Sequence, residues 1–229
     1  MKKSSILILI IICLVGCKKG SNETTITGEI KGLGTDTLYL YGMDELYDRI
    51  DTIYVENDKF SYTTSVDTIT SAYLLLKNRI EYPVFLDKGN KIKIKGDTIN
   101  LNFLTISGNI YNEEFTDFQK VLEDPADPSE KASEETVDKR ITVEKANTAE
   151  EMAEEFILQH HSSYVSLYLL DKYFVQKETP DFSKIKKLVE VMTGVLQDKP
   201  YIERLNETIT QAEKSEIGKY APFFSLPNA

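Results

Sequence analysis

The chain offers few side chains that could do covalent or metal chemistry. Its 229 residues include two cysteines, two histidines and 37 acidic residues. His160 and His161 are neighbours, and adjacent residues on a helix point about 100° apart, so the two cannot easily chelate one ion. The paired acidic residues lack the spacing of a glycosidase site or an EF-hand and are typical of solvated faces. The sequence therefore predicts no catalytic residue, no metal site and no cofactor.

Cys17 comes directly after a short apolar segment at the start of the chain. Lys2 and Lys3 precede an unbroken apolar run at residues 6–15. As a helix this run would cover about 15 Å, which is half of a hydrocarbon core. The pattern therefore predicts a signal peptide at residues 1–16 and not a membrane-spanning helix.

The tetrapeptide Leu14-Val15-Gly16-Cys17 resembles the lipobox of bacterial lipoproteins. In that motif the signal peptidase recognises Leu14, Val15 and Gly16, and the thiol of Cys17 receives the lipid. The resemblance implies diacylglycerol and palmitate on Cys17, so that no free thiol would be left for a redox centre. The alternative is an ordinary signal peptide in which Cys17 is incidental. Lys18-Lys19, in place of an aspartate, implies transport to the outer membrane, so we expect a lipid-anchored protein of the bacterial cell envelope.

The next part of the chain has the periodicity of β-strands. After a polar tether at 17–24, residues 25–108 hold about seven or eight β-type runs, separated by turn residues at roughly ten-residue spacing. Asn57-Asp58 between two such runs indicates a hairpin. Alternating Lys and Ile at 91–95 indicate a strand with one buried face. This pattern predicts an antiparallel β-sandwich-like domain or a partly open barrel.

The periodicity becomes helical after Gly108. Apolar stripes in the region 109–216 predict about four or five helices, with an acidic loop at 123–147. The fold class is therefore expected to be α+β, with the β-rich domain first and the helical segment second. The predicted helices cover residues 112–122 and 148–158, begin at 162 or 163, cover 182–196, and begin again at 199–200.

Several short motifs in this layout resemble a known family. They are Ile26–Ile30, Asp51–Ile53, Asn57–Tyr62, Tyr82–Leu86 and Ile106–Gly108. Their order resembles the N-terminal region of bacterial envelope lipoproteins in which a β-rich domain of unknown function and a helical segment precede a TlpA-like thioredoxin domain.

The last thirteen residues, 217–229, are similar to the opening segment of a TlpA-like thioredoxin domain, which often reads Gly-x-x-Ala-Pro-x-Phe-x-Leu. Gly218, Ala221 and Pro222 match this pattern, whereas Phe223 stands where an acidic residue is common. The C-x-x-C motif of that family would follow some tens of residues later and has no counterpart in the chain. We therefore expect a remnant of the segment and carry over no catalytic residue.

These observations favour a non-catalytic binding or scaffold module held at the membrane through Cys17. The net charge of −10 argues against a nucleic-acid partner. The resemblance implies a thioredoxin-like protein or a second copy of the chain as the partner. Two alternatives stay open: a truncated thiol-disulfide oxidoreductase that needs a separate redox domain, and a glycan- or peptide-binding surface lipoprotein. The second alternative would use the tyrosines of the β half, which are Tyr39, Tyr41, Tyr47, Tyr54, Tyr62, Tyr73 and Tyr82.

Overall fold

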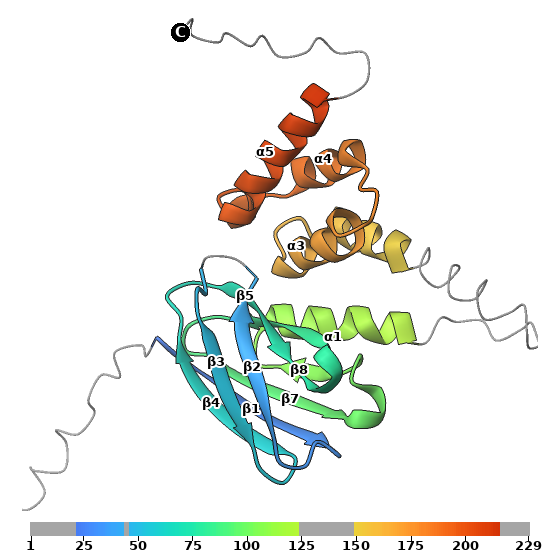
Figure 1. Cartoon of the computed structure of the whole chain (residues 1–229). Helices are drawn as coiled ribbons and strands as arrows, with labels where there is room; N and C mark the ends of the chain where they lie inside the picture. The colour runs from blue at the N-terminus through green and yellow to red at the C-terminus, as the bar shows by residue number, and fades with distance from the viewer. Residues whose placement is uncertain (1–21, 44–45, 124–148, 216–229) are drawn as a thin grey trace, which may run out of the picture.

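The computed structural model describes residues 22–43, 46–123 and 149–215 (Figure 1). Two four-stranded sheets come first and helices follow them, which confirms the predicted α+β class. The tether before residue 22, the acidic loop after Glu123 and the segment 217–229 lie outside the described residues. Within the described ranges, no helix is long and apolar enough to cross a membrane.

The two sheets share a β-sandwich-like arrangement. The first has the order β4-β1-β7-β8 and the second has the order β3-β2-β5-β6. The pairs are antiparallel except β1–β7, which is parallel, with Ile26 opposite Ile92. A two-residue period is common to both kinds of pair, so the sequence pattern alone could not distinguish them. The strands are β1 (Glu23–Lys31), β2 (Asp36–Gly42), β3 (Ile50–Val55), β4 (Lys59–Ser65), β5 (Thr70–Leu75), β6 (Glu81–Leu86), β7 (Lys91–Asp97) and β8 (Thr105–Ser107).

A tight hairpin joins the two sheets on one side. Asn57 and Asp58 have φ values of 50° and 69°, the left-handed geometry that a two-residue hairpin turn requires and that Asn and Asp tolerate. The turn takes the chain from β3 in the second sheet to β4 in the first. Asp58 Oδ1 also accepts a hydrogen bond of 2.6 Å from the amide of Gly34. The predicted hairpin is confirmed, and it forms one closed side of the β-rich part.

Helix α1 (Ile110–Glu123) joins the sheets on the opposite side, between β6 and β8. Asn112 accepts a 3.0 Å hydrogen bond from the amide of Phe85 and donates one of 2.9 Å to its carbonyl. Thr116 makes the same double contact with Ile106, at 2.9 Å each way. Gln119 donates to the carbonyl of Asn102 at 2.9 Å. We call Asn112, Thr116 and Gln119 the bridging residues, because their side chains bond main-chain groups, as a neighbouring strand would.

The remaining helices stack beyond α1, and Figure 1 shows α3 between the sheets and α4, with the first turn of α5 pointing back toward the sheets. All seven residues of α3 are buried, because the helix lies between the β-rich part and the other helices. The elements are a helix at 149–159, α3 (Tyr164–Leu170), a π-helix η4 (Asp171–Val175), α4 (Phe182–Val191), a 3-10 turn η5 (Gly194–Leu196) and α5 (Pro200–Ser215), with further 3-10 turns η2 (Lys77–Arg79) and η3 (Thr98–Asn100) among the strands.

Two predicted elements are shorter than expected. The helix predicted at 182–196 ends at Val191, because Met192 and Thr193 are extended and Gly194, with φ of 65°, starts a new turn. The last β-type run of the β-rich region, at 101–106, forms regular strand only from Thr105, and β8 spans Thr105–Ser107. In both cases buried leucines, Leu196 and Leu104, imitate the period of a regular element although they come from a turn or a loop.

One hydrophobic core runs through the sheets and the helices. Tyr168 of α3 is in the middle of it, with ring centroids 5.2 Å from Phe115 of α1 and 6.3 Å from Tyr73 of β5. Burying one such aromatic side chain contributes about 2 kcal/mol, and edge-to-face pairing adds roughly 0.5–1.5 kcal/mol. The helical segment therefore stabilises the β-rich part and is stabilised by it.

Candidate functional site

The predicted lipid-attachment site lies outside the described residues. This applies to Cys17 and to the peptidase recognition residues Leu14, Val15 and Gly16. The expected anchor therefore stays a prediction.

The two histidines have separate surroundings. The ring of His160 stacks on Phe156, with centroids 4.1 Å apart and an interplanar angle of 5°. Its Nδ1 lies 3.8 Å from Glu114 Oε1. His161 instead accepts a 3.0 Å hydrogen bond through its backbone carbonyl from the amide of Thr193. In the described ranges, no group of three or more His, Cys, Asp or Glu residues could hold a metal ion.

The tyrosines of the β half separate into core and surface residues. Tyr47 and Tyr82 are buried, and Tyr41, Tyr62 and Tyr73 are half-buried. Tyr39 and Tyr54 are 42% and 74% exposed on the outer face of the second sheet. Of the seven tyrosines that the sequence singled out, only these two are exposed, and Tyr54 offers the larger surface to a ligand.

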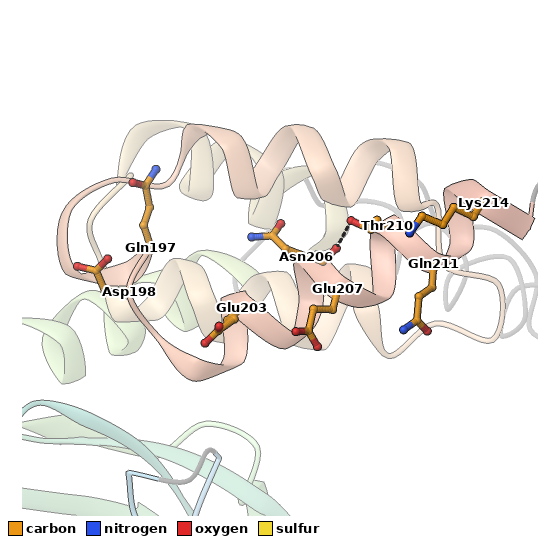
Figure 2. Close-up of a pocket in the computed structure, with 8 residues that line it drawn as sticks. All are labelled: Gln197, Asp198, Glu203, Asn206, Glu207, Thr210, Gln211 and Lys214. Atoms are coloured by element: carbon orange, nitrogen blue, oxygen red, sulfur yellow. Dashed lines mark hydrogen bonds between the residues drawn. The ribbon is translucent and has the colours of Figure 1, made fainter. Parts of the chain in front are cut away.

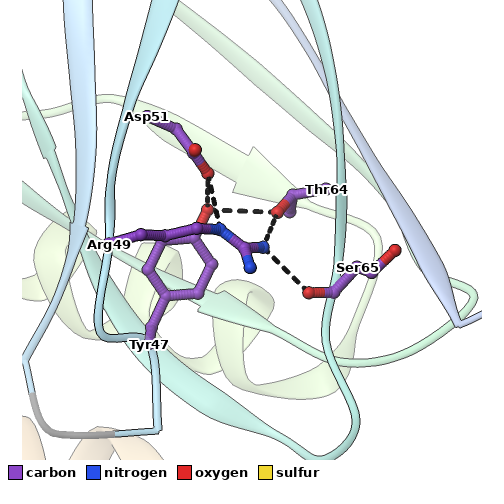
Figure 3. Close-up of polar contacts among 5 residues, drawn as sticks. All are labelled: Tyr47, Arg49, Asp51, Thr64 and Ser65. Carbon is purple, nitrogen blue, oxygen red and sulfur yellow. Dashed lines mark hydrogen bonds and ion pairs between the residues drawn. The ribbon is translucent and has the colours of Figure 1, made fainter.

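A polar cluster near the start of β3 ties this strand to the end of β4 (Figure 3). Arg49 forms an ion pair of 3.2 Å with Asp51 and donates a 3.0 Å hydrogen bond to the carbonyl of Ser65. The hydroxyl of Tyr47 also bonds Asp51, and it lies 3.1 Å from Thr64 Oγ1. These groups satisfy one another, so the cluster holds the two sheets together and leaves little for a ligand.

The charges of the cluster follow from these contacts. Partial burial alone would raise the pKa of Asp51, but hydrogen bonds from tyrosine hydroxyls and from Arg49 outweigh it and lower that pKa. Burial and the contact with Asp51 raise the pKa of Tyr47 to about 12. At neutral pH the cluster therefore contains a carboxylate, a guanidinium and a neutral phenol.

A hollow of about 900 Å³ lies along α5 and the turn before it (Figure 2). Every side chain that lines it is polar or charged, including Asp198, Glu203, Glu207 and Lys214. Ligand sites are usually lined mainly by apolar side chains with a few polar groups. This hollow offers almost no apolar side chain for a ligand to cover, so it is a weak candidate.

A second hollow, about 340 Å³, lies between α1 and the helix at 149–159, and we call it the interhelical groove. Its floor is apolar: Phe118 and Val121 come from α1, and Met152 and Phe156 come from the facing helix. The rings of Phe118 and Phe156 meet edge to face at 5.6 Å. Val121 is 56% exposed. The groove thus leaves apolar surface open to solvent between two helices.

Carboxylates surround this floor. Glu114 and Asp117 line the groove from α1, and Glu155 lines it from the other helix. Glu114 accepts a 2.5 Å hydrogen bond from Ser163 Oγ. Lys120 pairs with Asp117 at 2.7 Å, but both side chains are mostly exposed, so this pair contributes little. The groove therefore combines an apolar floor with a negative rim, which suits a ligand with apolar and cationic groups.

The sequence shows the helical spacing of the groove residues on each helix, but it does not show that the two helices lie side by side. Positions 114, 117, 118 and 121 share one face of α1, and positions 152, 155, 156 and 159 share one face of the other helix. The sequence predicted both helices and one apolar stripe for each. A second usable face of α1 was missed, because the pattern does not show which helices are neighbours.

Comparison with known proteins gives one match. Residues 24–115 match the family model described as Domain of unknown function (DUF4369). No curated protein and no solved structure matches the chain. The matched residues contain all eight strands except the first residue of β1, together with the first turns of α1. Residues 24–115 are therefore similar to a domain family whose function is not known.

Proposed function

We propose that this protein is a bacterial envelope lipoprotein, anchored in the outer membrane through lipid on Cys17, whose folded part is a non-catalytic binding module. The lipobox-like Leu14-Val15-Gly16-Cys17 supports the anchor. The resemblance to the N-terminal region of TlpA-associated lipoproteins supports a role in holding or positioning a partner. The observation that carries the binding role is the interhelical groove, with exposed Val121 and half-buried Met152 and Phe156 between carboxylates.

The shape and charge of the groove favour a basic amphipathic helix of a partner protein. Helices commonly bind by laying an apolar face into a groove between other helices. Leucine- or phenylalanine-sized side chains would cover Val121 and Met152, while Lys or Arg residues on the flanks would face Glu114 and Glu155. Charge complementarity of this kind raises the association rate and selects against acidic partners.

A charge placed on the groove floor should disrupt this binding. We expect Val121→Glu to weaken binding of a fluorescein-labelled Leu/Lys amphipathic helical peptide at least tenfold, measured by fluorescence anisotropy. The expected loss corresponds to about 1.4 kcal/mol, which is less than the value of one buried valine contact. Val195→Glu is the matched control, because Val195 is 57% exposed on η5, away from the groove. Equal effects of the two substitutions, or equal binding of a Leu/Glu peptide, would contradict this proposal.

The anchor can be tested separately from the groove. When the full chain is produced in a Gram-negative bacterium with radiolabelled palmitate, we expect label on the protein and partition into the detergent phase. Cys17→Ser should abolish both, because a serine hydroxyl does not receive the diacylglycerol. Cys13→Leu should leave both unchanged, since Cys13 lies inside the signal peptide. Label that persists in Cys17→Ser would refute the proposed anchor and leave the groove untouched.

A further inference from the structure

A small aromatic cleft lies where the π-helix η4 meets β6 and α1. Its volume is about 150 Å³. Rings of Tyr82, Phe115, Tyr168 and Tyr173 line it, together with the side chain of Lys172. Lys172 and Tyr173 both belong to η4, which follows α3 without a break. π-Helical turns inside helices are rare and occur frequently at functional sites.

Lys172 is the cationic group of this cleft. Its Nζ lies 5.6 Å from the ring centroids of both Tyr168 and Tyr173. No described carboxylate forms an ion pair with it. The side chain keeps access to solvent, but the surrounding protein atoms displace water from the ammonium and lower the pKa of Lys172. Within the described residues this cation, which lies near two aromatic rings, has no carboxylate partner and can therefore attract an anion.

The two acidic groups near Lys172 are engaged elsewhere. Asp171 is buried and accepts hydrogen bonds of 2.6 Å from the hydroxyl of Tyr201 and from Nε2 of Gln176. Glu81 lines the cleft, and its carboxylate accepts a hydrogen bond from the hydroxyl of Tyr41. Neither carboxylate forms an ion pair with Lys172, although the negative charge of Glu81 stays at the edge of the cleft.

We propose that this cleft binds a small aromatic carboxylate, with the ring among the aromatic side chains and the carboxylate on Nζ of Lys172. Size supports this class of ligand, because a protein cavity of about 150 Å³ can hold one benzene-sized ring. Edge-to-face contacts with Phe115 and Tyr173 would favour a flat ring over a branched aliphatic group. The cleft and the interhelical groove use different residues of α1, so this proposal does not rest on the proposed function.

Benzoate is the probe that tests the cleft. In titrations of the full chain followed by ¹H–¹⁵N NMR, we expect saturable shifts of the amides of η4 and β6. Lys172→Met should weaken benzoate binding at least tenfold, whereas Lys172→Arg, which keeps the charge, should retain it within about threefold. Lys187→Met is the matched control, because Lys187 is an exposed lysine of α4 outside the cleft. Neutral benzamide should bind at least tenfold more weakly than benzoate.

Three results would overturn the proposal. They are the absence of saturable shifts at millimolar benzoate, shifts confined to other elements, and equal affinities of the parent chain and Lys172→Met. Glu81→Gln supplies a further check, because removal of a negative charge from the cleft should strengthen benzoate binding and leave benzamide unaffected. If Lys172→Met does not fold, an unchanged affinity in Glu81→Gln would still refute the role of charge.

Discussion

Gly108→Ala is expected to lower the free energy of unfolding by at least about 4 kcal/mol. Gly108 lies between β8 and α1 with φ of 114°, a conformation that is costly for any residue with a side chain. A Cβ atom there would overlap the carbonyl oxygen of Lys91 and would lie 2.9 Å from Cα of Ile92. These are backbone atoms of β7, so they cannot move aside as a flexible side chain would. The substitution should therefore push α1 away from the sheets.

Gly34→Ala is the matched control for this prediction. Gly34 also has a positive φ, 71°, but no atom lies within 4 Å of the position of its missing Cβ. Gly34→Ala should therefore lower the free energy of unfolding only through backbone strain, by about 1 kcal/mol. Urea unfolding followed by far-UV circular dichroism measures both values. If both variants lose the same free energy of unfolding, the close approach of Gly108 to β7 does not contribute to the effect.

Asn112→Ala is expected to lower the free energy of unfolding by about 3 kcal/mol. Asn112 is 1% exposed, and its amide bonds both the N–H and the C=O of Phe85. Without it the carbonyl keeps a 2.8 Å hydrogen bond from Asn109, but the buried N–H of Phe85 loses its partner. An unpaired buried N–H costs roughly 1–3 kcal/mol, and the lost hydrogen bonds and the small cavity add to this.

Asp117→Ala, on the exposed face of the same helix, provides the comparison. Its ion pair with Lys120 is mostly exposed, so its removal should change stability by less than about 0.5 kcal/mol. Hydrogen exchange gives a second readout, because the amide of Phe85 should exchange much faster in Asn112→Ala than in Asp117→Ala. Slow exchange at Phe85 in both variants would show that another group satisfies this amide.

The motifs that carried the family resemblance are mostly determinants of the fold. In Ile26–Ile30, a Cβ at Gly28 would overlap the ring of Phe60, which covers that glycine. Asn57-Asp58 supplies the hairpin turn between the sheets. Five of the six residues of β6, which contains Tyr82–Leu86, are buried. The sequence could predict fold class because these residue types follow from local backbone geometry and burial.

Contacts between distant segments could not be predicted in this way. The polar side chains of Asn112 and Thr116 were part of a predicted helix, but nothing local showed that they would bond the edges of two strands. The parallel pairing of β1 with β7 and the helix break at Met192–Gly194 also could not be predicted from local sequence. The interhelical groove and the aromatic cleft are formed by elements whose proximity depends on the tertiary fold.

The position of the bridging residues has a consequence for the synthesis of this protein. Gln119 follows the last strand by twelve residues and lies beyond residue 115, where the family match ends. While the chain emerges from the ribosome, the edges at Phe85 and Ile106 stay open until Asn112 and Thr116 of α1 have been translated, and the carbonyl of Asn102 waits for Gln119. A nascent chain halted before that point would expose two strand edges to its neighbours on a polysome.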